Sequence, residues 1–195
     1  MKQKVKIYRM SISKVFPATH PRARENTFFR EKIMAALGLH QELRKECFQE
    51  PKPNKLHTCR SNYELWKKRI DEVNAGNAVL VLYEWKGKPY SKDGTNNLFV
   101  FGNEKTKGFM LELENMPEYE NKIFICDSKL GIQKLTFEKN AKYPSIIDLF
   151  SDGKYINYLQ LSNNDGLSMK DFEDWFKRYD LSKPMAIIHF TNFRY

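Results

Sequence analysis

The sequence is poor in cysteine and lacks the spacings that would put its cysteines to structural use. Its three cysteines, Cys47, Cys59 and Cys126, are widely separated and odd in number, and no Cys-x-x-Cys pair occurs. The four histidines show no metal-ligand spacing either. We therefore expect no disulfide framework, no metal site and no cofactor.

Long apolar runs are also missing. The longest purely apolar stretch, 78–83, is far shorter than the roughly 20 residues that a membrane-spanning helix needs. The basic start of the chain, 1–6, is followed by mixed polar residues rather than the apolar core of a secretory signal. These features predict a cytoplasmic protein without a membrane partner.

Core-forming residues and positive charge are both plentiful. The chain has 195 residues, 41% of them hydrophobic and 14% aromatic, which is enough for one large domain and excludes a wholly disordered protein. Its 33 basic and 24 acidic residues give a net charge of +9. Such an excess favours polyanionic partners, although a soluble protein with many surface lysines would show the same balance.

Helical patterns occur at three places in the sequence. An apolar repeat at Phe29, Ile33 and Leu37 predicts a first helix, which a polar helical stretch over 40–47 continues. The capping-box spacing of Ser61-Asn62-Tyr63-Glu64 and a following apolar stripe predict a helix over 62–75. A third helix is expected to begin at Ser168, with Leu167 packed on Phe172.

The remaining ordered segments are mostly strand-like. The stretch 144–150 is instead expected to form one or two helical turns. Short segments rich in β-branched and aromatic residues predict strands at 78–85, 98–101, 109–113, 122–126, 132–137 and 185–193. Short strands with helices interspersed at the ends indicate an α+β fold, a small mixed sheet that closes towards a barrel.

Three motifs follow one another along the chain: Lys55-x-x-Thr58-x-Arg60, then Gly76-Asn77 before a strand, then Asn164-Asp165-Gly166-Leu167-Ser168 before a helix. Their order resembles the ASCH branch of the PUA-like superfamily, small β-barrels associated with RNA. Asn77 replaces the usual acid of the second motif, and Asp165 stands where the family commonly has glutamate. The resemblance covers roughly half of the chain.

The resemblance implies a single PUA-like domain over 1–195, with an insertion around 38–54 and an elaborated middle section around 91–150. It implies binding of RNA or a nucleotide-like ligand in a basic cleft centred on Lys55–Arg60. Because some small bacterial members hydrolyse N4-acetylcytidine, it also implies an alternative in which Lys55, Thr58 and Asp165 are catalytic.

Amide hydrolysis needs a nucleophile, a base and a group that stabilises the oxyanion. Thr58 would supply the hydroxyl, and Lys55 the base if its pKa fell from roughly 10.4 towards neutrality. Asp165 would orient the lysine, and Arg60 would hold a phosphate or polarise a carbonyl. Strand alternation opposes this arrangement, since Thr58 and Arg60 share a face while Lys55 points the other way unless the chain bends.

Other basic and aromatic residues are also candidates for ligand contacts. Arg22 and Arg24 lie in a basic loop, and Lys88 and Tyr90 interleave a cation with an aromatic ring, as single-stranded nucleic-acid sites do. His189, inside the last strand, could face a ligand. Each also fits a plainer interpretation as a surface charge, a loop residue or a core histidine. A third hypothesis is a non-catalytic interaction protein of a phage or mobile element; the oligomeric state stays open.

Overall fold

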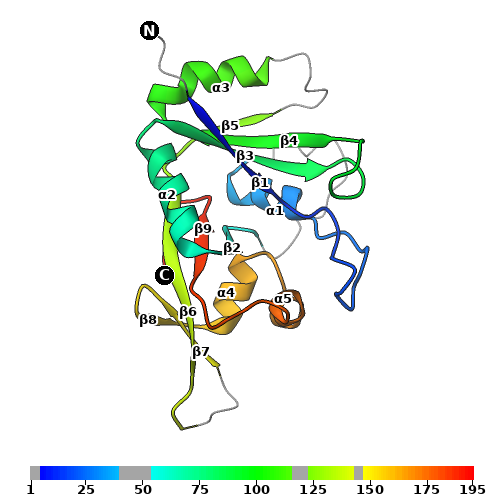
Figure 1. Ribbon diagram of the computed structural model, residues 1–195, viewed down its shortest axis with the longest axis vertical. Coiled ribbons are helices and arrows are strands. Elements are labelled where there is room, and N and C mark those ends of the chain that lie inside the picture. Colours follow the sequence, from blue (N-terminus) through cyan, green and yellow to red (C-terminus); the bar gives the residue numbers. More distant parts are fainter. Residues whose placement is uncertain (1–4, 40–53, 116–122, 143–146) are drawn as a thin grey trace.

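The computed structural model describes residues 5–39, 54–115, 123–142 and 147–195, which fold into two β-sheets with helices packed around them (Figure 1). The α+β class predicted from the sequence is confirmed. The strands are β1 Lys6–Ser11, β2 His57–Ser61, β3 Ala78–Trp85, β4 Thr95–Gly102, β5 Phe124–Asp127, β6 Gly131–Lys139, β7 Ile147–Ser151, β8 Lys154–Ile156 and β9 Met185–His189. The helices are α1 Phe29–Ala36, α2 Tyr63–Asn74, the 3₁₀ turn η2 Glu104–Thr106, α3 Lys107–Glu114, α4 Tyr158–Asn164 and α5 Met169–Phe176.

The first sheet has four strands in the order β1-β3-β4-β5. β1 is parallel to β3, β3 and β4 form an antiparallel hairpin, and β5 is parallel to β4. The central strands β3 and β4 are buried on both faces over much of their length, which is why they read as continuous apolar runs in the sequence.

The second sheet has five antiparallel strands in the order β2-β9-β6-β7-β8. β9 lies between β2 and β6, and all five of its residues are buried. The described strands form these two separate sheets and close no barrel, so the predicted closure is not found.

The helices lie in three layers, one between the two sheets and one on the outer face of each sheet. One core contains side chains of α1, α2, β1, β3, β4 and β9, which places α1 and α2 between the sheets (Figure 1). α3 covers the outer face of the first sheet, where Met110 and Leu113 pack with Val79, Val81 and Val100. α4 and α5 cover the outer face of the second sheet. No helix in the described part of the chain is long and apolar enough to cross a membrane.

Most of the predicted elements are confirmed. The helices at 29–36, 63–74 and 169–176 and the strand at 78–85 lie within a residue or two of the expected positions. The cap of α2 is Asn62, one residue after the Ser61 of the predicted capping box, and its side chain accepts a hydrogen bond from the Leu65 amide at 3.1 Å. Ser168 caps α5 in the same way, through the Asp171 amide. The predicted helix over 40–47 lies outside the described residues.

The strand expected over 109–113 is wrong, because these residues lie in α3. Phe109, Met110 and Leu113 follow helical spacing and pack on the first sheet. The start of the helix is set by η2, where Asn103 and Thr106 form a reciprocal capping box. An apolar run of five residues is too short for periodicity alone to separate the two structures.

The helical turns expected over 144–150 are also wrong where the chain is described, since β7 begins at Ile147. β7 pairs with β8 through a tight turn in which Asp152 and Gly153 both have positive φ, 49° and 81°. Asp-Gly at these positions is typical of a two-residue hairpin.

Candidate functional site

The first and third of the three motifs on which the family resemblance rests lie side by side. Lys55 forms an isolated antiparallel bridge with Asp165, and the Leu56 amide donates to the Asn164 carbonyl at 2.8 Å. Asp165 ends α4, and Gly166 then turns the chain with φ +77°. A Cβ at Gly166 would lie 3.0 Å from the Lys55 Cβ, so this close approach requires glycine.

The Lys55 side chain is buried and fully engaged. Its Nζ donates to the Asp165 carbonyl at 2.6 Å and to Asp165 Oδ1 at 2.9 Å, and it lies 4.1 Å from the centre of the Phe29 ring. Only 1% of the side chain is exposed. Burial lowers the pKa of Lys55, although the Asp165 carboxylate acts in the opposite direction.

Asp165 collects donors from three residues around one carboxylate oxygen. Besides Lys55 Nζ, the Cys59 amide donates to Oδ1 at 3.2 Å, and His57 Nδ1 lies 3.5 Å away. Burial by itself would raise the pKa of Asp165, but the charge of Lys55 and the contact with His57 outweigh it and hold the pKa below its usual value. The carboxylate therefore ties β2 to the end of α4.

Thr58 does not join this group. It pairs with Ile188, which packs in the core between the sheets, whereas Cys59 pairs with Ile187 in the core beneath α4 and α5. Cross-strand partners share a face, so Thr58 and Cys59 point to opposite sides of β2. Within the described residues no hydrogen bond joins Thr58 to Lys55 or Asp165. The expected alternation is confirmed, and the proposed catalytic three do not converge.

Arg60 is committed to the backbone of the first sheet. Its guanidinium donates to the Ser11 carbonyl at the end of β1, at 2.6 Å, and burial lowers its pKa. The side chain therefore links β2 to β1 and is not presented as a free phosphate contact.

Two neighbouring histidines line the other end of β2. His57 is fully buried, its Nε2 is hydrogen-bonded to the Tyr195 hydroxyl at 2.7 Å, and burial lowers its pKa. His189 lies beside it, with ring centres 5.4 Å apart, and burial lowers its pKa to about 2. Both nitrogens of His189 and Nδ1 of His57 lack a hydrogen-bond partner in the described part of the chain.

Three potential metal ligands meet at this place. One donor atom each from His57, Cys59 and Asp165 lie within 4.8 Å of one another, and all three residues are buried. The histidine and cysteine share one face of β2 because they are two residues apart, but the aspartate comes from a distant segment. Because Asp165 is far from His57 and Cys59 in the sequence, residue spacing does not reveal the cluster. The available local signal is that His57 and Cys59 are two residues apart in a strand and therefore share a face.

The basic loop before α1 is partly absorbed by the fold. Arg22 pairs with Asp171 at 2.9 Å and with Glu25 at 2.7 Å, and its guanidinium lies 4.5 Å from the Phe16 ring centre. Arg24 is exposed and has a φ of 70°. Both arginines are exposed, but the Arg22 guanidinium is held by ion pairs and the Phe16 ring.

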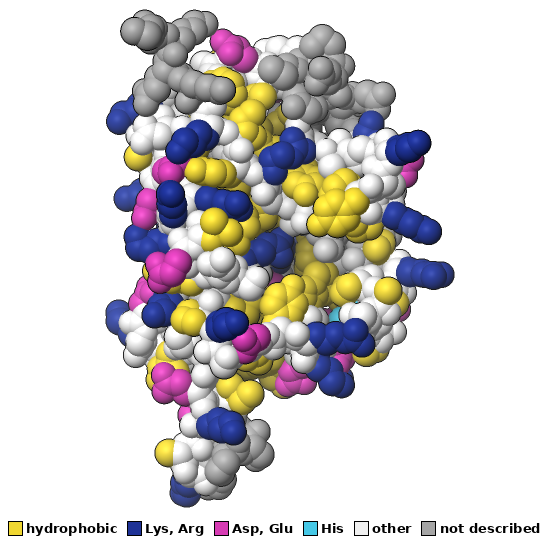
Figure 2. All heavy atoms as spheres, viewed as in Figure 1, with side chains coloured by type: hydrophobic (Ala, Val, Ile, Leu, Met, Phe, Trp, Pro, Cys, Tyr) yellow, Lys and Arg dark blue, Asp and Glu magenta, His cyan; other side chains and the backbone are white. Residues whose placement is uncertain are grey.

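The β3–β4 hairpin carries a row of three aromatic rings, Tyr83, Trp85 and Tyr90. We call these rings, together with Lys88 of the same hairpin and Arg9 of the neighbouring strand β1, the hairpin surface. The Trp85 ring lies 5.6 Å from Tyr83 and 5.0 Å from Tyr90, centre to centre. The Arg9 guanidinium lies 4.8 Å from the Tyr83 ring centre. Tyr90 is 91% exposed. Figure 2 shows one face of the molecule where apolar patches are bordered by lysines and arginines.

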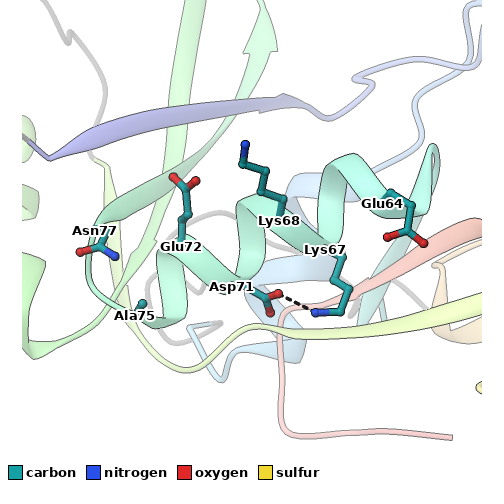
Figure 3. Close-up of a pocket in the computed structure, with 7 residues that line it drawn as sticks. All are labelled: Glu64, Lys67, Lys68, Asp71, Glu72, Ala75 and Asn77. Atoms are coloured by element: carbon teal, nitrogen blue, oxygen red, sulfur yellow. Dashed lines mark hydrogen bonds and ion pairs between the residues drawn. The ribbon is translucent and has the colours of Figure 1, made fainter.

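A shallow hollow along the outside of α2 has no comparable character (Figure 3). Acidic and basic side chains alternate there, and Lys67 pairs with Asp71 at 2.6 Å. Mixed, solvated charges on one helix face stabilise the helix modestly and select no particular ligand.

No protein-family model matches the chain, and no curated protein or solved structure is significantly similar to it.

Proposed function

We propose that the protein binds single-stranded nucleic acid, RNA in particular, on the hairpin surface. The observation that carries the proposal is the series of touching rings Tyr83, Trp85 and Tyr90, which ends in a tyrosine that is 91% exposed. An aromatic side chain this exposed gains nothing from the protein core. Base stacking on such rings is a common way of holding single strands, and it tolerates any sequence.

Cations around the rings supply the electrostatic attraction to the phosphates of the nucleic acid. Lys88 and Lys92 are exposed and form no ion pair with the described residues, so both are available to phosphates. Arg9 donates to Thr95 Oγ1 at 2.9 Å and to Asn97 Oδ1 at 2.8 Å, which fixes its guanidinium over Tyr83. A prearranged surface loses little side-chain entropy on binding.

This location differs from the cleft centred on Lys55–Arg60 that the sequence suggested. The Lys55 ammonium is bound to Asp165 and the Arg60 guanidinium to the Ser11 carbonyl. Freeing Lys55 for a phosphate would leave the buried Asp165 carboxylate without its counter-charge, which costs several kcal/mol. Lys55 and Arg60 are better assigned to holding the fold together.

We also propose that the chain is a divergent relative of the ASCH branch. The contact between the Lys55 and Asp165 segments supports this, because it joins two motifs that lie far apart in sequence. The RNA association implied by that resemblance agrees with the proposed binding activity, whereas the described strands do not close the barrel expected for the family.

Fluorescence anisotropy with a short labelled oligouridylate tests the binding proposal. The loss of one stacking ring costs about 1–3 kcal/mol, so Tyr90→Ala should raise Kd by about 5- to 150-fold. Tyr155→Ala is the matched control, because Tyr155 is also exposed but lies on β8 in the second sheet. Log affinity should fall linearly with log salt.

Equal affinities for Tyr90→Ala and Tyr155→Ala would contradict the proposed surface. No binding by the intact protein at low salt, to either single- or double-stranded probes, would remove the activity altogether. A non-catalytic interaction protein would then be the better hypothesis.

The Lys55–Asp165 pair favours a second candidate, an amidohydrolase for an acylated nucleoside. The ion pair at 2.9 Å supplies two of the three residue types that such a reaction uses, and Thr58 on the opposite face of β2 weakens it. N4-acetylcytidine should then be deacetylated by the intact protein and not by Lys55→Met that has been shown to fold. Absence of turnover by the intact protein would exclude this substrate.

A further inference from the structure

We propose that His57, Cys59 and Asp165 form a buried site for one transition-metal ion, with zinc as the best match. Their donor atoms come within 4.8 Å of one another. One nitrogen, one sulfur and one carboxylate oxygen make a donor set that zinc accepts. The sequence spacing predicts no metal site, and the inference rests on the folded arrangement.

His57 and Cys59 have uncommitted donor atoms, whereas the Asp165 carboxylate is shared with Lys55 and lies 3.5 Å from His57 Nδ1. His57 Nδ1 is buried without a hydrogen-bond partner in the described residues, and an unsatisfied buried nitrogen costs about 1–3 kcal/mol. Cys59 is a free, buried thiol. Both hydrogen bonds to the Asp165 carboxylate reach Oδ1, and within the described chain Oδ2 accepts none.

The surroundings of the three donors are those of a metal site. Metal-binding histidines usually direct their second ring nitrogen to a fixed partner. His57 Nε2 is hydrogen-bonded to the Tyr195 hydroxyl at 2.7 Å, and Asn164 Nδ2 donates to that hydroxyl at 3.1 Å. The Asp165 carboxylate is oriented by hydrogen bonds from Lys55 Nζ and the Cys59 amide to Oδ1.

The required movement is small. Zinc–ligand bonds of about 2.0–2.3 Å at tetrahedral angles put neighbouring donors about 3.3–3.7 Å apart. Donors that already lie within 4.8 Å of one another need to approach by at most about 1.1–1.5 Å. The three protein ligands leave a fourth position for a water molecule.

Lys55 is the competing cation, and the charges show how both states are balanced. Without metal, the Lys55 ammonium neutralises Asp165. When a divalent ion binds, the Cys59 thiol releases its proton, and the sulfur–metal bond replaces the S–H bond. Thiolate and carboxylate together then neutralise the ion. Counting the Lys55 ammonium, the site then carries one excess positive charge, which is removed when Lys55 also releases a proton; the neutral amine still donates to the Asp165 carbonyl.

The ion would fasten β2 to the segment that follows α4. Since all three ligands are buried, it would enter while the chain folds, and metal binding would add directly to stability. This role is independent of the hairpin surface, which lies on the other sheet.

Cobalt(II) is the probe, because a cobalt–thiolate bond absorbs in the near ultraviolet and tetrahedral cobalt absorbs in the visible. A Cys47→Ser background is refolded with Co²⁺, so that only Cys59 and Cys126 can supply a thiolate. We expect both absorptions, one metal ion per chain, and a Tm raised by roughly 5–10 °C when free metal exceeds Kd about 100-fold.

Cys59→Ser should lose the near-ultraviolet band, and His57→Gln should lose the Tm shift. Circular dichroism checks that both variants fold. Cys126→Ser, at a buried thiol in β5, is the matched control and should keep both. Less than one tenth of a metal ion per chain after refolding of the intact protein would overturn the proposal. So would a band that persists in Cys59→Ser.

Discussion

Removing either charge of the Lys55–Asp165 pair should destabilise the fold strongly. The two side chains are 1% and 4% exposed, so Lys55→Met or Asp165→Asn leaves the other member buried without its counter-charge. Such a loss typically costs about 3–5 kcal/mol. The exposed pair Lys67–Asp71 is the control, and Lys67→Met should change the free energy of unfolding by less than about 0.5 kcal/mol.

The double variant separates the interaction between the two charges from the interactions that each makes with its surroundings. Lys55→Met combined with Asp165→Asn removes both charges, so it should cost about 2 kcal/mol less than the sum of the single variants. Urea unfolding in the presence of EDTA gives each free energy from the midpoint and the slope. Losses below about 1 kcal/mol for both single variants would refute the view that this pair holds β2 against α4.

The Lys55–Asp165 pair also makes the free energy of unfolding depend on pH in the acid range. Because the folded pKa of Asp165 lies below its unfolded value, the carboxylate contributes stability that is present above an unfolded pKa of about 3.9. That contribution is lost as the pH falls through the folded pKa. The difference in unfolding free energy between the intact protein and Asp165→Asn should therefore be constant near neutral pH and shrink below about pH 4. A difference that stays constant to pH 2 would contradict the sign.

Substitutions at Gly166, Asn62 and Tyr90 test three further local features. Gly166→Ala should cost more than Gly153→Ala in urea unfolding, roughly 2–3 against 1 kcal/mol, because both have positive φ but only Gly166 lies against the Lys55 side chain. Asn62→Ala should lose about 1 kcal/mol and Asn62→Gly far less, since the cap has a φ of 63°. Tyr90→Gly should raise the free energy of unfolding by about 0.5–1 kcal/mol, because glycine relieves a φ of 62°, and it should weaken RNA binding. A variant that is stabilised but binds RNA as tightly as the intact protein would contradict the assignment of Tyr90 to the hairpin surface.

The parts of the fold that sequence predicted well are those where local and tertiary signals agree. α2 has a side-chain cap and an apolar stripe, Trp66, Ile70 and Val73, that packs in the core between the sheets. β3 is a run of buried residues between two turns. In such segments the hydrophobic period alone identifies the element.

Where a short apolar segment is compatible with both the helical and the strand period, tertiary contacts determine which structure forms. α3 has the same composition as a strand, and its start depends on a capping box formed by Asn103 and Thr106. β8 is three residues long and exists because the turn at Asp152-Gly153 brings it against β7. Neither feature follows from propensity.

The candidate site was predicted in part. The pairing of Lys55 with Asp165 followed from motif order, and the separation of Thr58 followed from the two-residue period of a strand. The burial of Lys55 did not follow, because lysine is seldom buried and nothing local marks this one. The meeting of Asp165 with His57 and Cys59 depends on where α4 ends against β2, which one sequence does not encode locally.

Photo-crosslinking tests the proposed binding surface most directly. A short 4-thiouridine-substituted RNA is irradiated with the protein, and the modified peptides are identified by mass spectrometry. The proposal predicts adducts within the β3–β4 hairpin, at Trp85 or Tyr90, that disappear at high salt. Adducts concentrated instead at Arg24, along α2, or in the Lys55–Arg60 segment would contradict it.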